Sequence, residues 1–469
     1  MELGKRIKQL RQDAGLSQQE FADYTGFSVS YIQKFEEGKR EMKTNHLIRF
    51  SKVLKLKPFD IINTESTNLE YNPTDKSAFS MTNIEYREKQ DSHRIFENEI
   101  IETISSDFFN IIELENIMDD KIKFKNPVED ILITNGDDIE DAVMYQASSI
   151  KEFGPKKSIK VITWNIRFGV ARLRFFGDGC GDRAILTKSE VTTGLEGLAA
   201  KIKKEDPDIL LLQEVDVQSK KTAYIDQAQW LLDNTDMNYG AYGSMWESQV
   251  ILADGLGRVN TGNLILSKWK LENAERHQLP LRNDQDGLTQ YFYLRRNVLK
   301  ATVAMPGNLF YAVNTHLTAF ATDDTKKKHL DGFKDVLDGI AAEGQYFIAG
   351  GDLNEIPPNA SKLDYCIEDQ CDNESYHTGG ESEHKEGAFF APEITWLNAL
   401  YQTYTPAISL SEYGRQEAEH FTHSPDNKLK LDRKLDYLWT NTNWTNGITH
   451  QEATELSDHI PVSAIWTVK

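Results

Sequence analysis

The sequence predicts an α/β domain that follows a small all-α domain, and two patterns support this fold class. From Ser158 onward, short apolar runs typical of buried strands alternate with helical apolar faces, such as the one over residues 330–340. Over residues 1–65, amphipathic segments are interrupted at three glycines, which indicates five short helices. We therefore expect helices packed on two face-to-face β-sheets, preceded by a helical domain.

Charge is distributed unevenly along the 469 residues. The net charge is −20, yet residues 1–65 hold 12 Lys and Arg against 9 Asp and Glu, which is +3 and leaves −23 for the rest. Duplex DNA attracts cationic surfaces, so electrostatics favour DNA binding by the N-terminal region alone.

Cysteine content and hydropathy indicate the cellular compartment in which the protein is expected. The chain has three cysteines, Cys180, Cys366 and Cys371, without zinc-ligand spacing, and Met1 begins no charged-then-apolar leader. These features indicate a reducing cytoplasm. No apolar run approaches membrane-spanning length, so we expect no membrane insertion.

A glycine pair followed by polar residues marks the predicted centre of the larger domain. The apolar run 345–349 leads into Gly350-Gly351, then Asp352 and Asn354. A carboxylate and an amide past a buried strand can hold a hard cation and a phosphate oxygen. Turn chemistry alone also explains a Gly-Asp pair, so this stretch needs support from other strand ends.

That support comes from five further polar clusters, each at the end of an apolar run. They are Trp164-Asn165, Gln213-Glu214, Asn314-Thr315-His316, Leu435-Asp436 and Ser457-Asp458-His459. With these motifs in this order, the chain over about residues 158–469 resembles the endonuclease/exonuclease/phosphatase superfamily. The resemblance implies a four-layer α/β sandwich, with two packed sheets flanked by helices and catalytic loops at one edge. It also implies a metal-dependent phosphoric ester hydrolase.

The resemblance also implies a metal site. Glu214 is the principal ligand, helped by Asn165 and Asp458. Because these ligands all offer oxygen, Mg²⁺ is expected, with Mn²⁺ as the alternative.

Catalytic roles follow from the same resemblance. Asp352 and Asn354 would position the nucleophile and the phosphate, while His459 would transfer protons with its ring oriented by Asp436. His316 would share the acid and base roles, as in the pancreatic-type nucleases and sphingomyelinases.

Two further residues are assigned to the substrate phosphate. Arg296 matches the family's phosphate-contacting arginine, and Asn263 would close the substrate groove. No carboxylate that would orient His316 can be placed with the same support; Glu247 is a candidate.

The N-terminal segment has helix-turn-helix spacing, with Ser17 and Ser28 as N-caps of consecutive helices. It resembles the lambda-repressor/Cro-type DNA-binding domain, in which Arg11 would pair with Glu36. By that resemblance the residues that would contact base edges of DNA are Gln18, Val29, Ser30 and Lys34. Those that would contact DNA phosphates are Lys39 and Arg40. The alternative is a protein-binding or dimerisation module of the same fold.

Three regions result: a helix-turn-helix domain over 1–65, a connecting region over 66–157, and the catalytic domain over 158–469. The connecting region combines a polar linker with an apolar stripe at helical spacing over 96–117, which is typical of a core or a homodimer seam, and a small α/β appendage. An insertion at 357–421 contains Cys366, Cys371, His377 and His384. Zinc would suit those residue types, but their irregular spacing favours a loop that covers the substrate.

Three functions fit the sequence. The first is a Mg²⁺-dependent phosphodiesterase, most simply a nuclease, that its helix-turn-helix domain brings to duplex DNA. The second is a hydrolase of a lipid or small phosphate ester with an autoregulatory DNA-binding domain. The third is a transcriptional regulator that senses a phosphorylated ligand, although such a degenerate domain would be expected to lose residues such as Glu214 or His459.

Overall fold

The computed structural model describes residues 3–25, 29–36, 50, 53–54, 139–174, 180–181, 183–251, 256–285, 290, 293–371, 376–377, 384–425 and 430–468. The chain divides into two compact units, Met1–Gly136 and Asp137–Lys469. The helical stripe over 96–117 and the predicted phosphate contacts Lys39 and Arg40 lie outside the described residues.

The first unit has the expected helix-turn-helix elements. Helices α1 (Leu3–Asp13), α2 (Gln18–Thr25) and α3 (Val29–Glu36) pack around a core that includes Ile7, Phe21, Ile32 and Phe35. Ser17 caps α2, since its Oγ accepts the Glu20 N–H at 3.1 Å and the Glu20 carboxylate accepts the Ser17 N–H at 2.8 Å.

The predicted pairing of Arg11 with Glu36 is confirmed. Arg11 Nη2 donates to Glu36 Oε2 at 2.9 Å, and both residues are buried. A buried, bidentate pair of this kind ties the last turn of α1 to the end of α3.

The second unit is built on two seven-stranded sheets. The first runs in the order β1 (Ile139–Asp141), β7 (Lys270–Gln278), β8 (Asn297–Met305), β9 (Asn308–His316), β10 (Phe347–Asp352), β12 (Asp436–Thr440) and β11 (Thr405–Pro406). The second runs in the order β13 (Trp444–Thr449), β14 (Val462–Thr467), β3 (Ser158–Asn165), β4 (Ile209–Asp216), β6 (Gly257–Ser267), β5 (Tyr239–Ile251) and β2 (Val143–Gln146).

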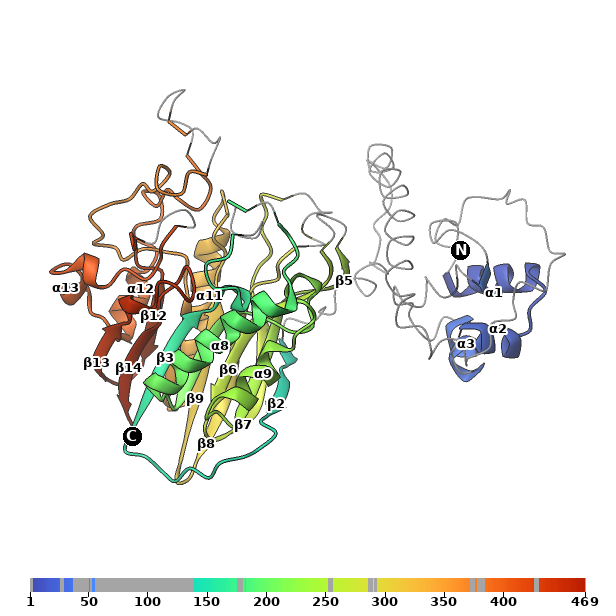
Figure 1. Ribbon diagram of the computed structural model, residues 1–469, viewed down its shortest axis with the longest axis horizontal. Coiled ribbons are helices and arrows are strands. Elements are labelled where there is room, and N and C mark those ends of the chain that lie inside the picture. Colours follow the sequence, from blue (N-terminus) through green and yellow to red (C-terminus); the bar gives the residue numbers. More distant parts are fainter. Residues whose placement is uncertain are drawn as a thin grey trace. The chain divides into compact units, whose positions relative to one another are not determined.

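Helices cover the outer face of each sheet, which confirms the four-layer class (Figure 1). Helices α8 (Lys188–Glu205) and α9 (Gln227–Asn234) pack on the second sheet, and α11 (Thr325–Ala342) and α12 (Asn398–Thr403) pack on the first. In β3, Val161 faces the other sheet while Ile162 faces the helices. Both strand faces are therefore buried, and for this reason the strand sequences are almost continuously apolar.

Strand register gathers the polar strand ends. In the first sheet Asp352 lies opposite His316 on β9 and opposite Asp436 on β12. In the second sheet Asn165 on β3 lies opposite Gln213, the neighbour of Glu214. The motifs therefore meet at one edge of the paired sheets.

Gly351 is required by the close approach of β10 to β9. A Cβ on Gly351 would lie 1.9 Å from the backbone oxygen of Thr315, and its φ is +150°. An L side chain cannot occupy that space, so the glycine allows Asp352 to reach its place beside His316.

Residues 139–146, which were expected in the connecting region, contribute strands to both sheets of the second unit. They form β1, which pairs with β7 in the first sheet, and β2, which pairs with β5 in the second. Both are short edge strands, and three or four residues are too few for their alternation to identify them in the sequence.

Most of the insertion is described as loops that surround short elements. These are α12, α13 (Leu410–Tyr413) and the 3₁₀ turn Glu417–Glu419. A small core of its own holds Ile356, Tyr365, Cys366, Ala388, Phe390 and Leu435. Among the described residues, no helix is long and apolar enough to cross a membrane.

Candidate active site

The gathered strand ends surround a pocket of about 160 Å³. The predicted residues that line it are Glu214, Arg296, His316, Asp352, Asn354, Asp458 and His459. Asn165 and Asp436 contact these residues from behind.

Glu214 occupies a strained position where β4 bulges. Its φ is +56°, a left-handed value that costs a non-glycine residue on the order of 1–3 kcal/mol. The carboxylate accepts a hydrogen bond from Asn165 Nδ2 at 3.1 Å. Burial and the Asp458 charge raise the pKa of Glu214 to about 7, because each disfavours the anion.

Asp352 lies beside the same amide. Asn165 Nδ2 donates to Asp352 Oδ2 at 3.1 Å, and the Asn354 N–H donates to Oδ1 at 2.9 Å. Burial raises the pKa of Asp352 to about 6, although the nearby His459 opposes the shift. Asn354 has a φ of +49°, and its own amide donates to the Leu317 oxygen at 3.0 Å.

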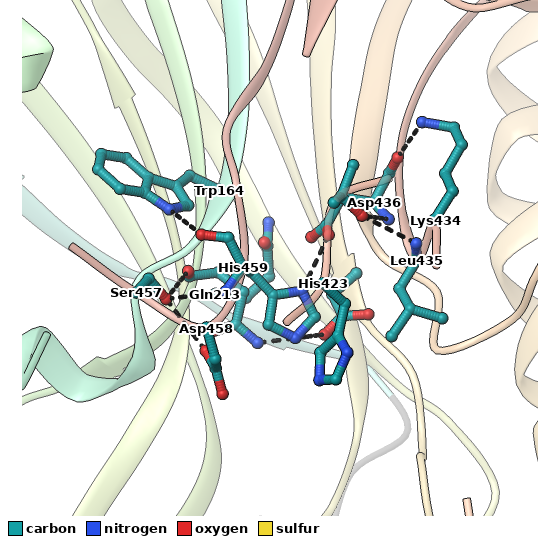
Figure 2. A network of polar contacts seen from close by, with 12 residues as sticks. Trp164, Gln213, His423, Lys434, Leu435, Asp436, Ser457, Asp458 and His459 are labelled. Carbon is teal, nitrogen blue, oxygen red and sulfur yellow. Dashed lines mark hydrogen bonds and ion pairs between the residues drawn. The ribbon is translucent and has the colours of Figure 1, made fainter. Parts of the chain in front are cut away.

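His459 is held by Asp436, as predicted. Figure 2 shows its ring directed at Asp436, with Nδ1 2.8 Å from Asp436 Oδ2, while Trp164 donates to its backbone oxygen. Its Nε2 lies 3.5 Å from Asp352 Oδ2. Burial disfavours the imidazolium, but the Asp436 and Asp352 carboxylates outweigh burial and raise the pKa of His459 well above its ordinary value.

Asp458 is paired with an arginine that the sequence did not single out. Arg167 Nε lies 3.5 Å from Asp458 Oδ2. Burial opposes the charge of Asp458, yet Arg167, His459 and His423 together lower its pKa to about 2. The pKa of Asp458 is therefore shifted down, whereas that of Glu214 is shifted up.

The pKa of His316 is shifted in the opposite direction to that of His459. Burial, together with the Arg296 and His459 charges, lowers the pKa of His316 well below its ordinary value. Its Nε2 lies 3.4 Å from Asp352 Oδ2, and its Nδ1 has no hydrogen-bond partner within the described part of the chain. Neighbouring histidines with divergent pKa values are suited to different roles, His459 as a cation and His316 as a neutral imidazole.

No ion pair joins Glu247 to His316 among the described residues. Glu247 lies on β5 opposite Asn260. The carboxylates within 4.0 Å of His316 are those of Asp352 and Glu214.

Arg296 and Asn263 differ in their relation to the pocket. Arg296 lines it, is buried, and has an Nε without a hydrogen-bond partner in the described segments. Asn263 is not among the lining residues; it is fully buried, and its Nδ2 donates to Asn297 Oδ1 at 3.1 Å. Arg296 therefore lines the pocket and Asn263 does not, although Asn263 Oδ1 also has no hydrogen-bond partner in the described segments.

Two family models match the chain. The model of the endonuclease/exonuclease/phosphatase family matches residues 162–459, and a helix-turn-helix model matches residues 7–61. The chain belongs to the endonuclease/exonuclease/phosphatase family. As a member of this family it is a phosphoric ester hydrolase, and its N-terminal domain is a helix-turn-helix domain.

Several solved structures are similar to this chain at low identity. The family member from Beutenbergia cavernae is 18% identical, with a TM-score of 0.41, and the match covers 67% of this chain and 72% of that one. Truncated Caenorhabditis elegans TDP2 is 18% identical (TM-score 0.39; 66% and 98% covered), and the human Nocturnin catalytic domain is 16% identical (TM-score 0.41; 70% and 98% covered). A search of curated proteins finds no match.

The donor set of this family member fits a divalent metal ion. Glu214, Asp352 and Asp458 offer carboxylate oxygens, the ligands preferred by hard cations. The raised pKa values of Glu214 and Asp352 reflect buried negative charge that a cation would compensate. Asn165 presents its NH₂ to these carboxylates, because its oxygen accepts the Arg167 N–H at 3.0 Å, so in this arrangement it orients the ligands.

Several pocket residues escaped the sequence analysis. They are Arg167, Phe168, Phe320, Asp369, Lys385, His423 and Arg433. Arg167 and Phe168 have φ values of +47° and +55°, and Arg433 donates to Asp369 Oδ2 at 3.0 Å. They belong to loops or, for Arg167 and Phe168, to the 3₁₀ turn Arg167–Gly169, and no periodic pattern marks such segments. Among them, only Arg433 adjoins a motif of the sequence analysis, because it directly precedes Lys434–Tyr437.

A disulfide joins Cys180 to Cys371 at the rim of the pocket. The two residues are separated by 191 positions, and the fold brings their Cα atoms to 5.3 Å. This pairing departs from the reduced state that the sequence predicted, so the cysteines no longer argue for a reducing cytoplasm. Only spatial proximity could have shown the pair.

The predicted DNA-reading residues are distributed over α2 and α3. Lys34 is exposed, and Val29 is partly buried against the domain core. The side-chain amide of Gln18 donates to Glu36 Oε2 at 2.8 Å, which links it to the Arg11 pair. The backbone of Ser30 lies in α3.

Proposed function

We propose that this protein is a Mg²⁺-dependent nuclease that residues 1–65 bring to duplex DNA. Mn²⁺ is the alternative ion. The observation that carries the proposal is one pocket that combines buried carboxylates, a histidine supported by Asp436, and the Arg296 guanidinium with an unpartnered nitrogen. These groups are those that phosphodiester hydrolysis requires.

The reaction would use the pocket residues as follows. Asp352 accepts a proton from the water that attacks phosphorus, and Asn354 helps to position that water. As the bond from phosphorus to the leaving oxygen breaks, protonated His459 donates its Nε2 proton to that oxygen, which leaves as an alcohol beside a phosphate monoester. Neutral His316 and cationic Arg296 hold the non-bridging oxygens. A Mg²⁺ ion held by Glu214 and Asp458 would supply charge neutralisation when bound.

Nucleic acid is favoured as the substrate for two reasons. The helix-turn-helix domain offers a means of reaching DNA, and the local excess of Lys and Arg agrees with this. Phe320, 44% exposed, lies at the pocket and could stack on a base. A cytoplasmic location, where intracellular DNA is accessible, is part of this proposal; homodimer formation is not.

A substrate panel tests the proposal. Plasmid DNA, RNA, sphingomyelin and inositol phosphates should be incubated with the protein in Mg²⁺ and in excess EDTA. Cleavage of DNA that EDTA abolishes is expected. Exclusive hydrolysis of sphingomyelin or of an inositol phosphate would replace the nuclease assignment with the hydrolase of a lipid or small ester. Inertness towards the whole panel would favour the ligand-sensing regulator.

A further inference from the structure

The insertion at 357–421 contains a mixed cluster of four potential metal ligands. Asp364, Cys366, His377 and His384 each offer one atom, and these atoms all lie within 4.8 Å of one another. His377 Nε2 is 3.4 Å from Asp364 Oδ2, and His384 Nδ1 is 3.5 Å from the same oxygen. Cys366 Sγ is 3.8 Å from His384 Nδ1.

These separations are close to the edges of a zinc coordination tetrahedron. Zinc bonds of about 2.0–2.1 Å to nitrogen or oxygen and about 2.3 Å to sulfur give ligand–ligand edges of roughly 3.3–3.6 Å. Small side-chain movements would bring all four atoms to one ion. We propose that Asp364, Cys366, His377 and His384 form a structural Zn²⁺ site, separate from the active site.

Neighbouring contacts hold the ligands in binding orientations. Asp364 Oδ1 accepts the Cys366 N–H at 3.0 Å, which leaves Oδ2 facing the two imidazoles. The Lys385 N–H donates to Cys366 Sγ at 3.1 Å, an interaction suited to a thiolate. The His384 ring stacks on Phe389 with centroids 3.6 Å apart. Such outer contacts orient ligands in metal sites.

A second cluster of potential ligands differs from this one because a lysine pairs with its carboxylates. Glu205, His450 and Glu452 also lie together, but Lys201 Nζ is 2.7 Å from Glu205 Oε1 and 2.5 Å from Glu452 Oε1. There the protein supplies its own cation. Within the described residues, no lysine or arginine forms an ion pair with Asp364, and the ring nitrogens close to its carboxylate are those of His377 and His384.

The chemistry of the ligands selects zinc. One thiolate, two imidazoles and one carboxylate suit Zn²⁺, whereas Mg²⁺ requires oxygen ligands. Four protein ligands leave no open position for a substrate, so the role is structural. Binding would release the Cys366 thiol proton, because the thiolate is the ligand.

The site would fix one wall of the active-site pocket. Lys385, which follows the ligand His384, lines the pocket, and its Nζ donates to the Asp369 oxygen at 2.5 Å. Asp369 in turn holds Arg433. A metal ion at His384 would therefore anchor this chain of contacts in a segment that has only a small core of its own.

Cobalt substitution of the full-length protein tests the proposal without any mutation. A thiolate at a tetrahedral site gives Co²⁺ a sulfur-to-metal charge-transfer band and intense visible d–d bands. We expect both, together with one zinc per chain in the protein as purified and dialysed in Mg²⁺ buffer. Folded protein that retains no zinc and shows no charge-transfer band would overturn the proposal.

Variants assign the ion to its ligands. Cys366→Ser and His384→Gln should abolish zinc retention and the charge-transfer band. Cys371→Ser, which removes the neighbouring disulfide cysteine, and Glu214→Gln, which alters the active site, should retain both. Zinc that is lost from Glu214→Gln but kept by Cys366→Ser would place the ion in the active site and contradict the inference.

Discussion

Removing the charge of Asp436 should reveal how far His459 depends on it. Asp436→Asn keeps the shape of the side chain, but the amide no longer stabilises the imidazolium 2.8 Å away. Since the Asp436 and Asp352 carboxylates raise the pKa of His459, losing one of them should lower that pKa. As pH rises, His459 then loses the proton that it donates to the leaving group at a lower pH than in wild type. The alkaline limb of the kcat profile should therefore move to lower pH.

The magnitudes follow from the roles of the two residues. His459→Ala should lower kcat by roughly 10²–10⁴-fold, the range for a positioned proton-transfer group, or about 3–5 kcal/mol. Asp436→Asn should cost less, on the order of 10–10²-fold, because His459 remains in place. The double variant should be little worse than His459→Ala, since the two act as a unit.

Steady-state kinetics at saturating Mg²⁺ on a small phosphodiester would measure these values, with circular dichroism to confirm folding. Asp436 is fully buried, so its unpaired carboxylate in His459→Ala could also lower stability, and the assay temperature should be well below each variant's Tm. Multiplicative losses, or an unchanged pH profile in Asp436→Asn, would refute the coupling and give Asp436 an independent role.

Three further predictions concern DNA binding, backbone geometry and pH. Residues 1–65 should bind duplex DNA with an affinity that falls as salt rises, and Lys34→Ala should reduce the slope of log Kd against log salt by about 1; an unchanged slope would remove Lys34 from the interface. Gly351→Ala should lower the free energy of unfolding by on the order of 3 kcal/mol in denaturant titrations, whereas Gly339→Ala, whose Cβ meets no atom within 4 Å, should not be destabilising. Burial lowers the pKa of His329 to about 4, so its contribution to stability is present above its ordinary pKa of about 6.5 and is lost as pH falls. Between pH 7 and pH 5 the free energy of unfolding should therefore fall by about 2 kcal/mol more in wild type than in His329→Gln. Equal losses in the two proteins would contradict this.

Much of the fold and of the active site could be predicted because strand ends are local in sequence. Glu214 and Asp352 each follow a continuous apolar run, and burial of both strand faces explains that continuity. The partnership of His459 with Asp436 was implied by the family resemblance of the motifs that contain them, and the two side chains are hydrogen-bonded in the structure.

What the sequence could not show depends on loop conformation. Cys180 and Cys371 meet only because two loops converge, and the irregular spacing of Asp364, Cys366, His377 and His384 conceals a compact cluster. Arg167 reaches Asp458 through a turn with positive φ, which no periodicity marks. The edge strand of residues 139–141 was missed because only its pairing with β7 defines it.

The dependence of DNA cleavage on Mg²⁺ in wild type and Glu214→Gln tests the central claim most directly. Losing the Glu214 charge weakens cation binding while the shape of the side chain is kept. Initial rates on a labelled duplex should rise to saturation with Mg²⁺ in wild type, vanish in excess EDTA, and remain at background for Glu214→Gln at the same concentrations. Full turnover in EDTA, or wild-type rates from Glu214→Gln, would contradict a metal-dependent nuclease at this site.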